Sequence, residues 1–501
     1  MAKTRKTLAR TAEWSIPLLE KFDKELARIA ASYQLDTYPN QIEIINAEQM
    51  MDAYSSVGMP LGYSHWSFGK QFLNVEKHYK RGYMGLAYEL VINSNPCITY
   101  LMEENTLAMQ TLVLAHACYG HNSFFKGNYL FKTWTSPESI IDYLVFAKNY
   151  ISQCEEQYGV DAVEAILDAC HSLMHYGVDK FKRPNKISLQ EEKARQSSRA
   201  QYLQSTVNEL WRTLPISAGK LTEKERFPSE PQENILYFIE KHAPLLEPWQ
   251  REIVRIVRKM AQYFYPQRQT KVMNEGWATF WHYVLINRLF DEQLVNDTFM
   301  LEFFHNHTNV IYQLPYDSKF YSGINPYTLG SNIFTDLRRI CENPTDEDNL
   351  WFPDYAGKDW LSTLDFAMRN FKDESFIAQF LSPKVVRDMK LFSILDNDER
   401  EELEVTNIHN NEGFKQLRQT LSNQYNLGFV EPDIQVYQVD LRGDRTLTLR
   451  YTQNHKRPLH KEAKDVIKHL HVLWGFPVKL ECVAENGDIT LLDECPSHSD
   501  K

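Results

Sequence analysis

The sequence lacks the short motifs that mark several common classes of enzyme. Its 501 residues contain no glycine-rich phosphate-binding loop, no Gly-x-Ser-x-Gly nucleophile turn and no Cys-x-x-Cys pair. These absences argue against a P-loop nucleotide hydrolase, a serine hydrolase of the α/β type and a zinc ribbon. The seven cysteines are an odd number and are scattered, which favours reduced thiols over a disulfide framework.

The sequence also has no excess of positive charge and no long apolar run. Its formal net charge is -11 at pH 7, whereas nucleic-acid-binding surfaces concentrate lysine and arginine. No segment reaches the apolar length that spans a bilayer, and the charged start MAKTRK has no apolar stretch behind it. We therefore expect a cytoplasmic protein with no nucleic-acid partner and no membrane span.

Aromatic and aliphatic residues are abundant enough for a large folded core. Hydrophobic residues make up 43% of the chain, with 27 Tyr, 27 Phe and 10 Trp, a composition unlike that of a disordered chain. Apolar side chains recur at helical spacing in many segments, namely residues 15–35, 83–94, 97–121, 136–159, 161–177, 248–264 and 274–290. The pattern predicts a mainly α fold with a large multi-helix body.

The tail follows a different pattern. Residues 434–441 and 446–453 alternate at period two around RGDR, residues 461–475 form an amphipathic helix that ends in glycine, and Asn486-Gly487 is a favoured hairpin turn. This order predicts a small C-terminal α+β domain of ββαββ type. We expect four segments: an N-terminal helical part, a charged helix with a linker, a second helical part and the small domain, at 1–181, 182–234, 235–428 and 429–501.

Two histidines stand in the apolar stretch LVLAHACYGHNSFF. On a regular α-helix the five-residue step from His116 to His121 turns the chain by about 500°, which leaves the side chains about 140° apart. Gly120 could allow a one-residue bulge that brings both imidazoles to one side, and such bulges tend to occur at functional sites. The histidines are therefore either metal ligands or core residues hydrogen-bonded to carbonyl groups.

A second motif, KVMNEGWATFWHY, supplies a carboxylate. Glu275, Thr279 and His282 share one helical face among bulky aromatic residues. A buried carboxylate needs a metal, a cation or a proton. Glu275 and His282 lie about 10 Å apart along the helix axis, so they do not ligate the same ion. His116, His121 and Glu275 thus predict a His₂Glu metal site, zinc being the first candidate because this donor set is frequent in catalytic zinc sites.

The spacing of His116 and His121 is similar to that of zinc peptidases with an HxxxxH motif. Those enzymes have a glutamate directly after the first histidine to activate water, and this chain has Ala117 there. A base would have to come from another segment. The candidates are Glu104 or its neighbour Glu103, His282 and His307.

Longer motifs indicate a family. The stretches HACYGHNSFFKGNYLF, SLQEEKARQ, PSEPQEN, MNEGWATFWHY, SGINPYTLG, FKDESFIAQFLSPKVVRD and YNLGFVEPDIQV closely resemble the SpoVR-like family, named after stage V sporulation protein R, and within it the YcgB branch. The resemblance covers nearly the whole chain. It implies a cytosolic protein linked to spore cortex formation or to stress and stationary phase, with a PrkA-type serine kinase and a YeaH-type protein as partners.

The residues and the resemblance leave two hypotheses open. In the first, the protein is a metal-dependent hydrolase or transferase that acts on an amide or peptide bond. In the second, it is a non-catalytic regulatory or assembly protein, and the polar cluster only organises the core. Loss of metal with unchanged folding in His116→Ala would favour the first hypothesis.

Overall fold

The computed structural model describes residues 7–8, 13–55, 62–63, 65–66, 89–180, 227–315, 318–319, 321, 323–391, 410–453, 459 and 462–496. Most of the charged helix and linker expected at 182–234 lies outside these residues. The chain divides into two compact units, Met1–Glu164 with Gln262–Glu431, and Ala165–Ala261 with Pro432–Lys501. The second unit thus joins residues 165–261 to the tail, a grouping that the sequence did not predict.

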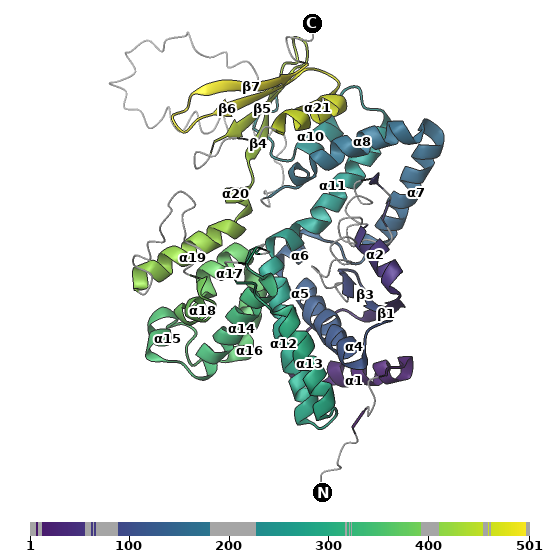
Figure 1. The fold of residues 1–501 in the computed structure, drawn as a ribbon. Coiled ribbons are helices and arrows are strands. Elements are labelled where there is room, and N and C mark those ends of the chain that lie inside the picture. Colours follow the sequence, from purple (N-terminus) through teal and green to yellow (C-terminus); the bar gives the residue numbers. More distant parts are fainter. Residues whose placement is uncertain are drawn as a thin grey trace, which may run out of the picture. The chain divides into compact units, whose positions relative to one another are not determined.

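The first unit is a body of helices, which confirms the mainly α prediction (Figure 1). No helix in the described part of the chain is both long and apolar enough to cross a membrane. Met1–Glu164, the first segment of this unit, contains these helices: α1 (Ile16–Ser32), α2 (Ala47–Ser55), α4 (Leu107–Val113), the π-helix η1 (Leu114–His121), α5 (Asn122–Gly127), α6 (Tyr129–Trp134), α7 (Ile140–Tyr158) and the start of α8 (Val160–Ser172).

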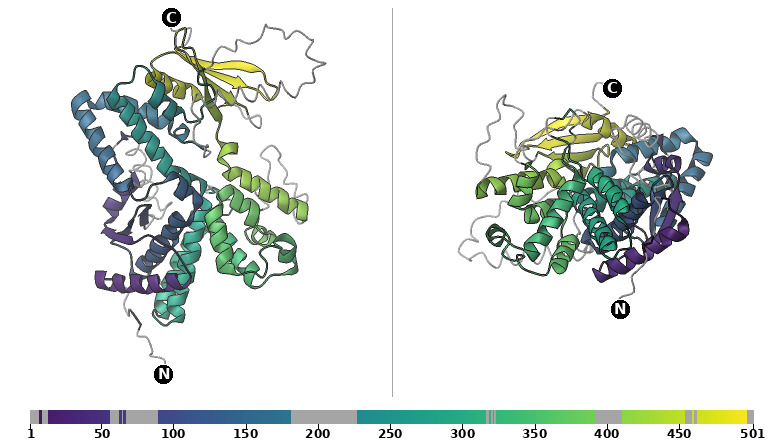
Figure 2. Two further views of the ribbon diagram at one scale, coloured as in Figure 1. Left: turned by 180° about the vertical axis from the view of Figure 1, so that it is seen from behind. Right: turned by 60° about the horizontal axis from the view of Figure 1, so that its bottom comes forward.

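The remaining helices of this unit follow the end of α11 (Pro248–Gln269). They are α12 (Lys271–Asp291), α13 (Asp297–Val310), α14 (Pro326–Glu342), α15 (Asp346–Trp351), α16 (Trp360–Asn370), α17 (Asp373–Phe380), α18 (Pro383–Asp388), α19 (Asn411–Tyr425) and α20 (Leu427–Val430). Figure 2 shows the same helices from behind and from below.

A small sheet in this unit corrects part of the sequence prediction. Strands β1 (Asn40–Ile45), β2 (Glu89–Ile92) and β3 (Cys97–Met102) form a sheet of order β1-β3-β2, with β1 parallel and β2 antiparallel to β3. We expected helix over 83–94 and from residue 97 onward, which is wrong for β2 and β3. A short apolar run fits a buried strand as well as a helix, and five of the six β3 residues are buried.

The core of the first unit surrounds α12. This helix packs against η1 on one side and against α14 on another, and 14 of its 21 residues are buried. Trp277 and Trp281 are among the largest fully buried side chains. Each large aromatic residue removes about 150–250 Å² from water, so burial fixes the rotation of α12 about its axis and with it the direction of its polar residues.

The second unit contains the predicted ββαββ domain. Strands β4 (Asp433–Val439), β5 (Leu447–Thr452), β6 (Val478–Val483) and β7 (Ile489–Cys495) form a sheet in that order, and α21 (Ala463–Trp474) connects the parallel strands β5 and β6. Gly475 ends α21 at φ 79°, and Gly487 in the second hairpin has φ 87°, as the sequence indicated. The unit also holds the 3₁₀ turn η2 (Met174–Tyr176) and α10 (Ile235–His242).

Candidate metal centre

The π-helix η1 resolves the spacing problem of the two histidines. Its residues Leu114–His121 follow i→i+5 hydrogen bonding, which places side chains five residues apart on the same side. The rings of His116 and His121 accordingly lie with their centroids 4.6 Å apart. Gly120 permits the close approach of η1 to α12, because a Cβ atom there would lie 2.5 Å from the Cα of Ala278.

A second close contact between helices positions Glu275. An added Cβ at Gly276 would lie 2.3 Å from the Cα of Gly330 on α14, and one at Gly330 would lie 2.0 Å from the carbonyl oxygen of Val272. Two glycines therefore allow α12 and α14 to touch along their backbones. This contact holds the preceding residue, Glu275, in place, and brings Tyr327 at the start of α14 to 6.1 Å from the His116 ring, centroid to centroid.

The three predicted ligands meet in the structure. One ligand atom each of His116, His121 and Glu275 lies within 4.8 Å of the others. Oε2 of Glu275 is 3.8 Å from Nε2 of His116 and 3.5 Å from Nε2 of His121. Both imidazoles are buried, at 3% and 6% exposure. Oε2 of Glu275 is also buried and accepts no hydrogen bond from the described residues, although it carries charge.

The outer nitrogens of both histidines are held by neighbouring side chains. Nδ1 of His121 lies 2.9 Å from Oδ1 of Asn274, so it must carry the proton and donate it. This leaves Nε2 of His121 with a lone pair that points toward Glu275. A side chain that fixes the outer nitrogen of a ligating histidine is the usual support of a metal site.

A row of three imidazoles extends from the cluster. Nδ1 of His116 is 2.9 Å from Nδ1 of His282, and Nε2 of His282 is 2.7 Å from Nδ1 of His307. If Nε2 of His116 is to accept a metal, its Nδ1 carries the proton, His282 then carries its proton on Nε2, and His307 on Nε2. One consistent set of neutral tautomers therefore satisfies the whole row.

The pKa shifts in the cluster favour an ionised glutamate beside neutral outer histidines. Burial acts to raise the pKa of Glu275, but the positive charge that His121 and His116 carry when protonated, together with hydrogen bonds from His116 and Tyr327, outweighs burial and lowers the pKa. Burial, followed by the nearby imidazoles, lowers the pKa of His282 well below its usual value and that of His307 to about 4. His282 and His307 are therefore uncharged at neutral pH.

A buried aspartate anchors the start of the ligand helix. Thr270, which precedes α12, makes no side-chain cap, and Asp373 from the first turn of α17 accepts hydrogen bonds from the backbone N–H groups of Val272 and Met273, both at 2.8 Å. These N–H groups have no partner inside the helix. Asp373 is 1% exposed, and burial raises its pKa to about 7 despite these hydrogen bonds.

The candidates for a base do not face the centre of the cluster. Glu104 is exposed and accepts a hydrogen bond from the backbone N–H of Ala47 at 3.1 Å, where it caps α2. His282 lies behind His116, and His307 lies behind His282. Sequence reasoning missed Asn274, Tyr327 and Asp373. All three lie in motifs that carry the family resemblance, but only Asn274 is next to a predicted ligand, since it precedes Glu275; no spacing linked Tyr327 or Asp373 to the histidines.

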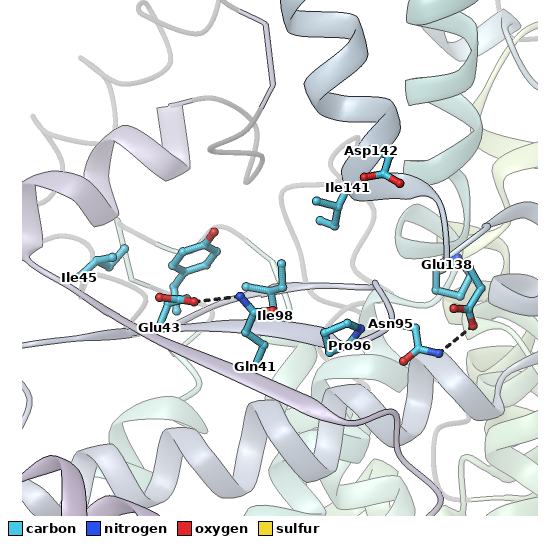
Figure 3. Close-up of a pocket in the computed structure, with 11 residues that line it drawn as sticks. Gln41, Glu43, Ile45, Asn95, Pro96, Ile98, Glu138, Ile141 and Asp142 are labelled. Carbon is cyan, nitrogen blue, oxygen red and sulfur yellow. Dashed lines mark hydrogen bonds between the residues drawn. The ribbon is translucent and has the colours of Figure 1, made fainter.

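The pocket in Figure 3 lies at a different place in the first unit. It has a volume of about 540 Å³ and is lined by β1, β3 and the region around the start of α7. Three carboxylates border it: Glu43, Glu138 and Asp142. Glu43 accepts a hydrogen bond from Gln41 at 2.9 Å and Glu138 one from Asn95 at 2.8 Å. Neither histidine nor cysteine lines this pocket, so it offers no soft metal ligand.

Comparison with known proteins assigns the family. A family model described as "SpoVR like protein" matches residues 13–430, and one described as "SpoVR-like C-terminal domain" matches residues 432–485. The chain is 63% identical over 498 residues to "Uncharacterized protein YcgB" of Escherichia coli (strain K12). The aligned residues cover 99% of this chain and 98% of that protein. No solved structure matches. The predicted resemblance is confirmed: the chain belongs to the SpoVR family.

Proposed function

We propose that this SpoVR-family protein is a metalloprotein that holds a divalent ion, zinc first, with Nε2 of His116, Nε2 of His121 and the carboxylate of Glu275. The observation that carries the proposal is the convergence, within 4.8 Å, of one ligand atom from each of two buried histidines and from the partly buried Glu275, on two helices. Two imidazoles and one carboxylate leave a fourth position open, as in catalytic zinc sites. A bound ion would also compensate the buried oxygen of Glu275.

The chemistry that fits such a site is hydrolysis or transfer of an amide or peptide bond. A divalent ion with three protein ligands polarises a carbonyl group and lowers the pKa of bound water. The chain supplies no carboxylate at position 117 to take a proton from that water. His282 and His307 would hold and orient His116 rather than act on a substrate, since both rings lie on its Nδ1 side.

Elemental analysis of untagged protein tests the metal. We expect close to one equivalent of zinc, manganese or iron per chain, lost in both Glu275→Gln and His121→Ala. Glu43→Gln and His305→Ala serve as matched controls, because Glu43 borders the other pocket and His305 is exposed. Wild-type protein that stays free of metal even after reconstitution would refute the proposal.

Two further measurements separate ion binding from catalysis. A chelator should lower the melting temperature of the wild type and leave Glu275→Gln unchanged, because an ion that binds only the folded state stabilises it by mass action. The loaded protein should then release new amino groups from peptides or cell-wall peptide fragments. Stoichiometric metal with no such release, beyond that of Glu275→Gln, would refute the hydrolase part alone.

The competing proposal is a regulatory or assembly role with a PrkA-type kinase and a YeaH-type partner. The edge strand β7 favours it, because Ile489, Leu491 and Leu492 are 50%, 55% and 41% exposed, and exposed apolar side chains on an edge strand suit strand addition by a partner. A cytoplasmic location and a role in cortex formation or stress belong to this proposal as much as to the first. A melting temperature of the wild type that does not change on addition of a chelator would favour the regulatory or assembly role.

A further inference from the structure

Thr279 is a buried polar residue that the three-ligand site does not use. It is 0% exposed, and its hydroxyl oxygen makes no hydrogen bond to the residues that the structure describes. A buried hydroxyl without a partner destabilises a fold by about 1–3 kcal/mol. Such a group inside a largely buried helix indicates a partner that is not part of the chain.

Other threonines in the helices of this protein show the partner that a buried threonine ordinarily takes. A threonine inside a helix usually donates its hydroxyl proton to the carbonyl oxygen four residues earlier. Six threonines in the described helices, or at the end of one, do so at 2.6–2.8 Å, namely Thr111, Thr133, Thr135, Thr270, Thr308 and Thr363. Thr279 has the same option with the carbonyl of Glu275 but does not take it.

The position of Thr279 on α12 directs it toward the cluster. It follows Glu275 by one turn, so their side chains lie about 40° apart around the axis, with Cβ atoms about 5–6 Å apart. It precedes His282 by three residues, so it lies on the strip between them. The ring of His116 spans this strip, because Nε2 faces Glu275 and Nδ1 faces His282. Thr279 therefore lies on the face of α12 that carries Glu275 and His282, next to the proposed ion.

We propose that the Thr279 hydroxyl donates a hydrogen bond to an oxygen atom of the ligand in the fourth position. The site would then select ligands that present an oxygen acceptor, such as an amide carbonyl or a carboxylate, over ligands that bind a metal through sulfur alone. This inference rests on the proposed metal centre and adds the chemical class of its ligand. The oxygen compensates Thr279 in the same way as the ion compensates Glu275.

Cobalt-loaded full-length protein provides the test, with Thr279→Val and Thr279→Ser as variants. Binding of acetohydroxamate, an oxygen ligand, and of ethanethiol, a sulfur ligand, is followed by the visible absorption of the cobalt ion. We expect Thr279→Val to weaken acetohydroxamate binding about 3- to 10-fold, the value of one hydrogen bond. Ethanethiol binding should stay unchanged, and Thr279→Ser should restore acetohydroxamate binding.

The stability of the metal-free variant gives an independent readout. Valine has nearly the shape of threonine and removes an unpartnered hydroxyl, so the melting temperature of apo Thr279→Val should equal or exceed that of the apo wild type. Equal losses for both ligands, no loss for either, or a lower melting temperature of the apo variant would each overturn the inference. Cobalt that binds normally in those cases leaves the metal proposal intact, whereas failure of cobalt to bind the wild type would overturn both.

Discussion

The first unit contains two places where carboxylates and other polar groups meet, and they differ in how their side chains are held. In the cluster, Glu275 and two histidines stand on packed helices, and one carboxylate oxygen is buried without a hydrogen bond from the described residues. In the pocket of Figure 3, Glu138 and Asp142 are exposed, and the side-chain amide of Asn95 satisfies Glu138. The first arrangement leaves a buried oxygen without a hydrogen bond, whereas the carboxylates of the second are bonded by the chain or open to solvent.

This difference separates a candidate site from a surface feature. Exposed carboxylates are solvated and need no partner, so their grouping carries little information. A buried carboxylate beside two oriented imidazoles is unfavourable in the empty protein. Strained or incomplete groups of this kind persist where function requires them. Substitutions in the structural supports of the cluster should therefore have large effects, and substitutions in the pocket should have small ones.

The largest expected effect on stability comes from the contact between Gly276 on α12 and Gly330 on α14, next to Glu275. In Gly276→Ala the new Cβ would lie 2.3 Å from the backbone of Gly330, and neither helix can move without disturbing its core. We expect the free energy of unfolding to fall by about 3 kcal/mol and metal binding to be lost, as measured by urea denaturation and elemental analysis.

Gly127→Ala is the matched control for this contact. Its Cβ would also approach another atom closely, at 2.4 Å, but that atom is the terminal methyl of Met368, which can turn away. The control should lose less than about 1 kcal/mol. Equal stability and equal metal content in the two variants would contradict the role of the α12–α14 contact in placing Glu275.

The next largest effect is expected at the outer side of His116. His282→Gln keeps a polar group but loses the imidazole that contacts Nδ1 of His116 at 2.9 Å. Removal of such a support typically weakens metal affinity about 10- to 100-fold, which competition with a chromogenic chelator measures. His305→Ala, on the exposed face of α13, should keep the wild-type affinity. Unchanged affinity in His282→Gln would show that His282 serves only as core packing.

The sequence predicted the three clustered residues from two facts of spacing. The five-residue step between the histidines together with Gly120 required a distortion of the helix, and the π-helix Leu114–His121 supplies it. Glu275 was found because a carboxylate among tryptophans needs a partner. The ββαββ tail followed from equally local signals, whereas the family followed from long motifs along nearly the whole chain.

Other parts could not be read from local patterns. Glu104 was named as a candidate base because Ala117 cannot serve as one, but its side chain accepts a hydrogen bond from the backbone N–H of Ala47 at the start of α2. Asp373 and Tyr327 reach α12 through helix packing, which no short motif encodes. The sheet was missed because Cys97–Met102 is apolar on both faces, so its period does not distinguish strand from helix.

A smaller effect is expected for the aspartate that caps α12. The pKa of Asp373 is raised to about 7 in the fold, above the usual value of about 3.9. The folded protein therefore binds this proton more tightly than the unfolded chain, and the stabilisation is lost as pH rises through 7. Between pH 6 and pH 8 the wild type should lose about 1 kcal/mol of unfolding free energy that Asp373→Asn does not lose.

Asp348→Asn is the control for this pH dependence. Burial acts to raise the pKa of Asp348, but hydrogen bonds from Arg339 and Thr345 outweigh it and lower the pKa to about 2, so this group does not titrate between pH 6 and pH 8. Urea denaturation at several pH values should give Asp348→Asn the slope of the wild type at a lower overall stability. A wild-type slope in Asp373→Asn as well would mean that the Asp373 carboxyl is already ionised below pH 6.

The smallest effect is expected in the pocket of Figure 3. Glu43→Gln, Glu138→Gln and Asp142→Asn remove its carboxylates while keeping side chains of nearly the same shape. Substitutions of this kind at exposed or half-buried surface positions usually change stability by no more than about 0.5 kcal/mol each, and amides can still accept the hydrogen bonds from Gln41 and Asn95. The triple variant should therefore keep its metal content and, within about 1.5 kcal/mol, its unfolding free energy. Loss of metal in this variant would contradict the separation of the two places, because it would couple an open acidic surface to the buried cluster.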